Sequence, residues 1–114
     1  MTMLQRSNRF SGLGSVRPCL KYGQSVRGPG LAMKYLKRNH TTHPRLSVLV
    51  SKKVSKKAVV RNRIRRRLMV AARPHIEQIQ EPYDFVISVY DIGYATKPWD
   101  VVDATTKNLF EKFK

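Results

Sequence analysis

The sequence predicts an α/β sandwich in which helices pack on one small central sheet. Three features carry this prediction: a long segment with helical periodicity at residues 56–73, short segments with strand character at 31–36, 45–51 and 83–90, and a final periodic segment that begins near Pro98. Strands and helices that alternate along a chain typically pack as layers around one hydrophobic core. We therefore expect helix, strand, strand, long helix, strand and helix, in that order.

An arm and a short helix are expected before the first strand. Residues 1–14 are polar, contain glycine and lack a helical period, so we expect an extended or partly mobile arm. Residues 15–22 place three apolar side chains on one helical face, and Gly23 follows as a C-terminal stop. Pro18 is tolerated in the first turn, because the N–H that it lacks would have no helical partner there.

The predicted strands alternate in the way that half-buried strands do. The strand at 31–36 follows a turn at 27–30 and has two differently used faces, one with Tyr35 and the other with Lys34. The strand at 83–90 is rich in β-branched and aromatic residues, which favour the extended conformation.

The helix at 56–73 combines an apolar stripe with arginine on its remaining faces. The stripe consists of residues at helical spacing: Val60, Ile64, Leu68, Ala71 and Ala72. Pro74 is expected to end or kink this helix, and residues 75–80 could add a further turn. The last helix has Thr96 or Lys97 as its cap. It turns five apolar side chains inward: Trp99, Val102, Leu109, Phe110 and Phe113.

Charge is divided sharply between two parts of the chain. The protein has 23 Lys and Arg against 7 Asp and Glu, which gives a formal net charge of +16 and a pI of about 10.7. Residues 1–76 hold 19 of the basic side chains and no acid, whereas residues 77–114 have a net charge of −3. A merely solvated basic surface usually interleaves both signs, so this separation indicates a polyanionic partner with closely spaced phosphates.

The composition excludes several classes of protein. With 114 residues the chain is expected to form one domain, residues 1–114. Its single Cys cannot form an internal disulfide, which excludes a secreted disulfide scaffold and indicates a reducing, intracellular setting. No apolar stretch approaches the roughly 18 to 20 residues that span a bilayer, and the N-terminal residues lack the apolar core of a signal peptide. We expect a soluble cytoplasmic protein with no membrane partner.

The residues offer no catalytic centre made of protein side chains. Residues 1–76 contain no carboxylate that could bind Mg²⁺ or act as a base, and Cys19 has no placed His partner. His40 and His43 have i, i+3 spacing, but two histidines without a nearby Cys or carboxylate are more often a solvated loop than a metal site. We expect no metal ion to be held by the protein alone.

Two motifs follow one another in the middle of the chain. A strand ends in Ser51-Lys-Lys53, and after a short basic loop a helix opens with Ala58-Val-Val-Arg-Asn-Arg-Ile-Arg-Arg66. This pairing resembles the protein subunit of bacterial ribonuclease P. The segments Arg6-Ser-Asn-Arg-Phe10 and Lys21-Tyr-Gly-Gln-Ser-Val26 are similar to further elements of that family. The resemblance thus covers nearly the whole chain, strongly at 45–73 and loosely elsewhere.

The resemblance implies that an RNA subunit carries the chemistry. In this family Mg²⁺ ions held by the RNA and substrate cut precursor tRNA at the mature 5′ end, and the protein binds the catalytic RNA and the single-stranded 5′ leader, with no DNA partner. Arginine forks suit phosphates, and the amide of Asn62 suits a base edge or a 2′-OH. The implied RNA contacts lie on the long helix, the loop before it and the arm: Arg61, Asn62, Arg63, Arg65, Arg66, Lys52, Lys53, Lys56, Lys57, Arg6 and Arg9.

The family also implies an unusual topology. Its crossover from the strand at 45–51 through the long helix to the strand at 83–90 is left-handed. General rules favour a right-handed connection between parallel neighbours. We follow the family.

The leader-binding cleft of the family lies between the first helix and the sheet and uses aromatic side chains for stacking. Two helix positions usually filled by aromatics hold Val16 and Leu20, which we expect to belong to the core. The strand position holds Lys34 without a gap, or Tyr35 after a one-residue insertion, and these two face opposite sides. If Lys34 faces the cleft, leader binding depends more on charge and hence on salt.

Two other functions remain open. A structural ribosomal protein or a general RNA chaperone would fit the size, the charge and the basic arm. The pairing of Ser-Lys-Lys with Arg-Asn-Arg argues against this alternative. A basic helix for membranes or for an acidic helical partner would not require the flanking strands.

Overall fold

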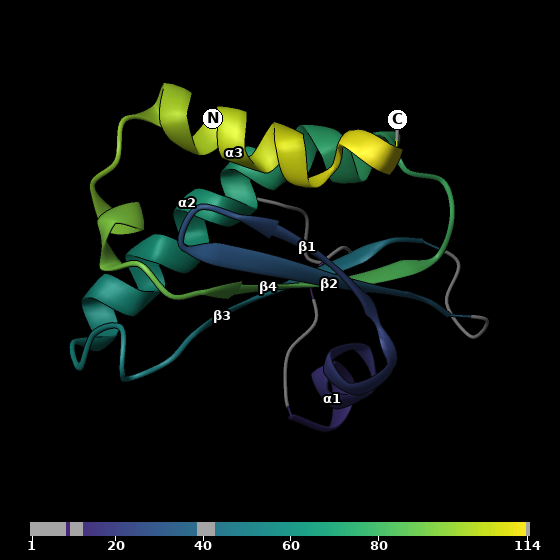
Figure 1. Cartoon of the computed structure of the whole chain (residues 1–114), viewed down its shortest axis with the longest axis horizontal. Helices are drawn as coiled ribbons and strands as arrows, with labels where there is room; N and C mark the ends of the chain where they lie inside the picture. The colour runs from purple at the N-terminus through teal and green to yellow at the C-terminus, as the bar shows by residue number, and fades with distance from the viewer. Residues whose placement is uncertain (1–8, 10–12, 39–42, 114) are drawn as a thin grey trace.

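A four-stranded mixed sheet forms the centre of the structure, a computed structural model that describes residue 9 and residues 13–38 and 43–113 (Figure 1). The elements follow in chain order: α1 (Leu13–Tyr22), β1 (Gln24–Gly28), β2 (Leu31–Lys37), β3 (Arg45–Val50), α2 (Ala58–Gln78), β4 (Tyr83–Val89), the 3₁₀ turn η2 (Ile92–Ala95), α3 (Trp99–Leu109) and the 3₁₀ turn η3 (Glu111–Phe113). The predicted mixture of helices and one small sheet is confirmed.

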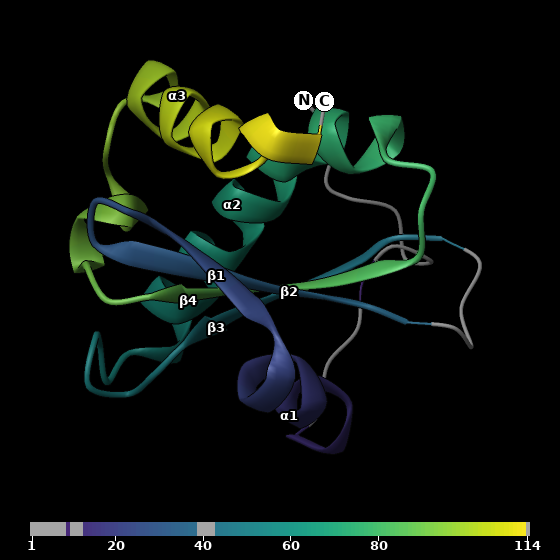
Figure 2. The same ribbon diagram turned by 45° about the vertical axis from the view of Figure 1, so that its right-hand side comes forward.

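The strand order is β1-β2-β4-β3. β1 pairs antiparallel with β2, and β2 pairs antiparallel with β4, whereas β3 and β4 are parallel neighbours joined by α2. In Figures 1 and 2 these two strands run in the same direction beneath α2, and β4 lies on the viewer's side of β3. The crossover is therefore left-handed, as the family resemblance implied and against the general rule.

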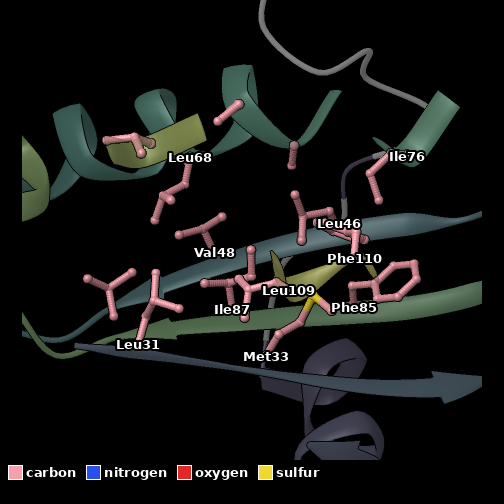
Figure 3. Close-up of a cluster of buried hydrophobic side chains, with 14 of the residues drawn as sticks. Leu31, Met33, Leu46, Val48, Leu68, Ile76, Phe85, Ile87, Leu109 and Phe110 are labelled. Atoms are coloured by element: carbon pink, nitrogen blue, oxygen red, sulfur yellow. The ribbon is translucent and has the colours of Figure 1, made fainter. Parts of the chain in front are cut away.

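Helices cover both faces of the sheet. α2 and α3 lie on one face, and α1 lies on the other, which we call the α1 face (Figure 2). The main core fills the space between the sheet and α2, where side chains from both layers interdigitate (Figure 3). Ile64 and Leu68 of α2 are 0% exposed there, and Phe85 of β4 packs edge-on against Phe110 with 5.2 Å between the ring centroids. A smaller cluster under α1 consists of Val16, Cys19 and Val86.

The strand β1 was missed by the sequence prediction, which placed a turn at 27–30. Arg27 and Gly28 instead pair with Ala32 and Leu31, and the turn is confined to Pro29 and Gly30. An edge strand that exposes most of its side chains carries little apolar alternation, so periodicity gives no signal for it. Gly30 has a φ of +69°, a conformation in which glycine is favoured.

The helix ends also differ from the expected ones. α1 begins at Leu13, so residues 13–14 are helical and not part of the arm, while residues 1–8 and 10–12 lie outside the described structure. α2 begins at Ala58 and continues through Pro74 to Gln78, so Pro74 does not end the helix and residues 75–78 add the further turn that was expected as an alternative. The buried Ile76 holds this turn on the core. The cap of α3 is Pro98 and not Thr96 or Lys97.

Among the helices of residues 13–38 and 43–113, none combines the length and the apolar character that a membrane span requires.

Candidate nucleic-acid interface

The outward faces of α2 present the basic side chains predicted for RNA contact. Burial of the apolar stripe on the sheet fixes the rotation of the helix, so that the residues between stripe positions face solvent. Asn62, Arg63 and Arg66 are exposed, whereas Arg61 and Arg65 are half-buried. Within the described part of the chain the side chains of Arg63 and Arg66 make no hydrogen bond or ion pair. Their guanidinium groups are available to phosphates.

The two half-buried arginines are held by local partners. Arg61 Nη1 donates to the carbonyl of Ser55 at 2.9 Å, which ties the helix to the preceding loop. Arg65 Nη1 donates to Oδ1 of Asn62 at 2.5 Å. This contact orients the Asn62 amide, because its oxygen is engaged and its NH₂ group points elsewhere. An oriented NH₂ donor suits an acceptor on a base edge or a ribose.

The loop between β3 and α2 extends the same surface. Its four lysines are exposed: Lys52, Lys53, Lys56 and Lys57. Val54 packs against the main core, and its N–H donates to the carbonyl of Ser51 at 3.1 Å, so the loop backbone is anchored between the lysines. The first turn of α2 contains no acid, and its cap residue Lys57 makes no side-chain cap hydrogen bond. The positive end of the helix dipole therefore adds to the lysine charges. We call the polar side chains of this loop and helix the basic surface: Lys52, Lys53, Lys56, Lys57, Arg61, Asn62, Arg63, Arg65 and Arg66.

Arg67 differs from its neighbours, although it belongs to the same run of arginines. Its Nη1 donates to the carbonyl of Tyr94 at 2.5 Å, and its Nη2 donates to the carbonyl of Lys97. The guanidinium lies 4.7 Å from the ring centroid of Trp99. Arg67 thus clamps α2 to the start of α3. Its position in the sequence gives no signal of this role.

The N-terminal arginines can be placed only in part. Arg9 forms a parallel bridge with Leu46, at the outer edge of β3. Its Nε is buried and, within the described residues, has no hydrogen-bond partner. Arg6 lies outside the described structure.

The sheet register decides between Lys34 and Tyr35. Lys34 lies on the α1 face, where its Nζ donates to the carbonyl of Leu20 at 2.6 Å, near the negative end of the α1 dipole. Tyr35 faces the opposite side, is 7% exposed and packs edge-on against Phe113 with 4.9 Å between ring centroids. Its hydroxyl donates to Gln24 Oε1 at 2.8 Å. Tyr35 therefore does not line the α1 face, since alternate residues of a strand face opposite sides.

The two α1 residues differ from each other in burial. Val16 belongs to the buried cluster under α1, as expected of a core residue, and offers no surface to a ligand. Leu20 is half-buried at the margin of that cluster. Of the four candidate cleft residues, Lys34 and Leu20 remain accessible on the α1 face.

Cys19 is a structural residue of the same cluster. Its Sγ donates to the carbonyls of Lys34 and Asp84, each at 3.4 Å. Burial raises the pKa of the thiol to about 11, and the nearby Asp84 carboxylate adds to the shift. The thiol is therefore protonated at neutral pH and is a poor nucleophile.

The sequence prediction missed three residues on the α1 face. Ser25, Arg27 and Tyr90 line a pocket of about 320 Å³ together with Ala32 and Lys34. Alternation along β4 places Tyr90 on the same face as Val86 and Ser88, and this signal is present in the sequence. The missed strand β1 supplies the other two residues, so they could not be placed without it.

The described residues hold no metal centre. Within residues 9, 13–38 and 43–113 no group of three or more His, Cys, Asp or Glu is arranged to hold an ion. His40 lies outside these residues, and His43 is exposed.

Comparisons of the sequence with a family model and with curated proteins point to the same family. Residues 4–114 match the protein family described as Ribonuclease P. A Pseudanabaena sp. protein named Ribonuclease P protein component is 34% identical over 113 residues, which cover 98% of this chain and 96% of that protein. A protein of the same name from Clostridioides difficile is 33% identical over 109 residues, which cover 92% of this chain and 93% of that protein.

Solved structures share the fold. The RNase P protein of Staphylococcus aureus aligns with a TM-score of 0.79 at 20% identity and covers 94% of this chain and 98% of its own. The RNase P protein of Thermotoga maritima aligns with a TM-score of 0.75 at 20% identity and covers 91% of this chain and 96% of its own. The left-handed crossover and the helices on both faces thus belong to a known architecture.

Proposed function

The chain belongs to the ribonuclease P protein family, and we propose that its basic surface binds the catalytic RNA of that enzyme while the α1 face holds the 5′ leader of precursor tRNA. The protein is the accessory subunit of a ribonucleoprotein endoribonuclease. In the proposed complex the RNA subunit and the substrate hold the Mg²⁺ ions that cut the phosphodiester bond, and the protein holds none. The site of action is the cytoplasm, where precursor tRNA is processed.

The observation that carries the proposal is the continuity of the basic surface. The exposed lysines of the loop and the exposed arginines of α2 follow one another without an intervening acid, since residues 1–76 contain none. Phosphates that bind there release their condensed counterions, which makes binding favourable and strongly dependent on salt. Arg63 and Arg66 can each grip a phosphate with two parallel hydrogen bonds. The surface thus lowers the repulsion between two RNA molecules.

The protein side chains support a role in binding and not in bond cleavage. Asp84 is buried in an ion pair with Arg45, and Asp91 accepts a hydrogen bond from the N–H of Gly93, so both carboxylates serve the fold. The thiol of Cys19 is protonated at neutral pH. None of these three groups is suited to act as a base or a nucleophile, which supports bond cleavage by the RNA subunit.

The test is cleavage of a 5′-labelled precursor tRNA by a bacterial ribonuclease P RNA at low Mg²⁺, with and without this protein. We expect the protein to increase cleavage at the mature 5′ end and to have no activity without the RNA. Binding of RNA without stimulation by any of several catalytic RNAs would favour a ribosomal protein or a general RNA chaperone instead.

A second arm tests the assigned surface. Replacement of Arg61, Asn62 and Arg63 by alanine together should abolish most of the stimulation. The matched control is Lys107→Ala, which removes an exposed cation of α3 outside the basic surface. Full activity of the triple variant would contradict the assignment.

A further inference from the structure

We infer that the groove between the first half of α2 and the start of α3 holds one unpaired base of the catalytic RNA, with the indole of Trp99 as its stacking partner. This inference rests on the proposed function and deepens it, because it names what the protein recognises in that RNA besides its phosphates. The groove has a volume of about 670 Å³. We call it the Trp99 pocket, and the described residues that line it are Val59, Asn62, Arg63, Arg66, Arg67 and Trp99.

The start of α3 is fixed beside α2. Arg67 of α2 donates to the carbonyls of Tyr94 and Lys97, and Trp99 packs against the main core. Figures 1 and 2 show η2 and the start of α3 at the end of the molecule where α2 begins. Trp99 is only half-buried, so part of its indole remains open to the pocket. A ring held in this way loses little freedom when a base stacks on it.

Val59 adds a second apolar side chain to the pocket. It lies in the first turn of α2, is 80% exposed and belongs to neither of the two buried clusters, so the fold makes no use of it. Together with the indole of Trp99 it forms an apolar area within the basic surface. Exposed apolar area with a polar rim is typical of a binding site. A phosphate gains nothing from this area, whereas the flat face of a base does.

The rim of the pocket supplies groups for the rest of a nucleotide. Arg65 engages the side-chain oxygen of Asn62, so the NH₂ group of Asn62 is left to donate to a base edge. The guanidinium groups of Arg63 and Arg66 suit the flanking phosphates. No carboxylate is among the described residues that line the pocket, so a polyanion meets no like charge there. A stacking surface beside cations is how proteins hold unpaired nucleotides, whereas a fully paired helix keeps its bases inside.

The first experiment uses the emission of Trp99, which is the only tryptophan of the chain. The full protein is titrated with a bacterial ribonuclease P RNA or with a blunt, fully paired RNA duplex, and precursor tRNA is added afterwards. We expect the catalytic RNA to quench the emission and to shield the indole from acrylamide, while the duplex binds without either effect. Equal quenching by the duplex would overturn the inference. Quenching that begins only when precursor tRNA is added would show that the substrate supplies the base, which also overturns it.

The second experiment compares two exposed valines, each near the start of a helix. Val59→Ala should weaken binding of the catalytic RNA by about threefold to tenfold, because the base loses contact with two methyl groups. The slope of log affinity against log salt should not change, since no charge is removed. Val101→Ala is the matched control, because Val101 is 42% exposed on α3 and does not line the pocket. Equal affinities of both variants and the wild type would contradict the inference.

Two replacements of Trp99 separate stacking from packing. Trp99→Leu keeps an apolar side chain on the core and removes the aromatic face, whereas Trp99→Phe keeps a ring. Stacking of one base corresponds to about a fivefold to hundredfold change in affinity, which Trp99→Leu should lose and Trp99→Phe should largely retain. Thermal unfolding by circular dichroism defines a temperature at which both variants are folded, and binding is compared there. Equal losses in the two folded variants would rule out stacking.

Cleavage assays on the same preparations distinguish failure of this inference from failure of the proposed function. If the wild type stimulates cleavage while its emission stays unchanged on binding the catalytic RNA and Val59→Ala binds normally, the Trp99 pocket alone is wrong. If the catalytic RNA quenches Trp99 and Val59→Ala weakens its binding, but the wild type stimulates no cleavage, the pocket stands as an RNA-binding site and the proposed function fails.

Discussion

Arg45 and Asp84 form a bidentate ion pair between the neighbouring strands β3 and β4. Nε and Nη2 of Arg45 each donate to one carboxylate oxygen of Asp84 at 2.9 Å. The Asp84 side chain is 0% exposed, whereas the Arg45 side chain keeps 23% of its surface in contact with solvent. The two partners therefore depend on each other unequally, because water can replace Asp84 around Arg45 but cannot replace Arg45 around Asp84.

This asymmetry predicts that Arg45→Met destabilises the protein more than Asp84→Asn. Removal of Arg45 leaves a buried carboxylate without its partner, which costs about 3 to 5 kcal/mol. Asp84→Asn leaves a guanidinium that water can partly solvate, so a smaller loss is expected. Urea unfolding of both variants measures the free energies. An equal or larger loss for Asp84→Asn would contradict the predicted order.

Arg66 and Arg67 are adjacent, and we predict that their replacement by alanine changes the stability of the protein by very different amounts. Arg67→Ala removes two charge-assisted hydrogen bonds to backbone carbonyls and the contact with Trp99, at a cost of about 2 kcal/mol or more in stability. Arg66→Ala removes an exposed side chain and should change stability by no more than about 0.5 kcal/mol.

The two variants should also differ in their affinity for RNA. Arg66→Ala is expected to weaken binding of the catalytic RNA, whereas Arg67→Ala should bind normally at temperatures where it is folded. Thermal unfolding and RNA titration on one preparation of each variant provide both readings. A loss of RNA affinity in Arg67→Ala without a loss of stability would show that the clamp has been misassigned.

The basic surface predicts a graded dependence on salt. Each lysine or arginine that neutralises a phosphate contributes roughly 0.7 to 0.9 to the slope of log affinity against log salt. Replacement of Arg63 and Arg66 together should therefore reduce the slope by up to about 2. A double variant of Lys107 and Lys112, cations outside the basic surface, is the control and should keep the slope of the wild type.

Burial of Cys19 predicts a loss of stability at high pH. The pKa of the thiol is about 11 in the folded protein and 9.0 in its ordinary state, so between these values the folded chain holds a proton that the unfolded chain releases. The contribution of Cys19 to the free energy of unfolding is fully present below pH 9.0 and is lost as the pH rises through about 11. The unfolding free energies of the wild type and Cys19→Ala should therefore converge between neutral pH and pH 11, because the variant lacks this proton. A constant difference over this range would refute the prediction.

Local periodicity is enough to predict most of the helices and strands. The stripe of α2 was predicted correctly because Ile64, Leu68 and their neighbours repeat at the spacing of a helix, and this repeat does not depend on what covers them. The strands β2, β3 and β4 were predicted because their side chains alternate with a period of two, which is also a local pattern. The division of charge between the two parts of the chain likewise indicates a polyanionic partner, since it depends only on the order of the residues.

Contacts between distant segments distinguish the roles of residues that look alike in the sequence. Arg67 differs from Arg66 because Trp99 comes to lie beside it, and Tyr35 is a core residue because the register of β2 turns it toward Phe113. β1 is held by its pairing with β2 and carries no apolar pattern of its own. The order of residues thus specifies the local elements and the sign of the partner's charge. The direction in which each side chain faces depends on packing and strand pairing between segments far apart in the chain, which no local pattern encodes.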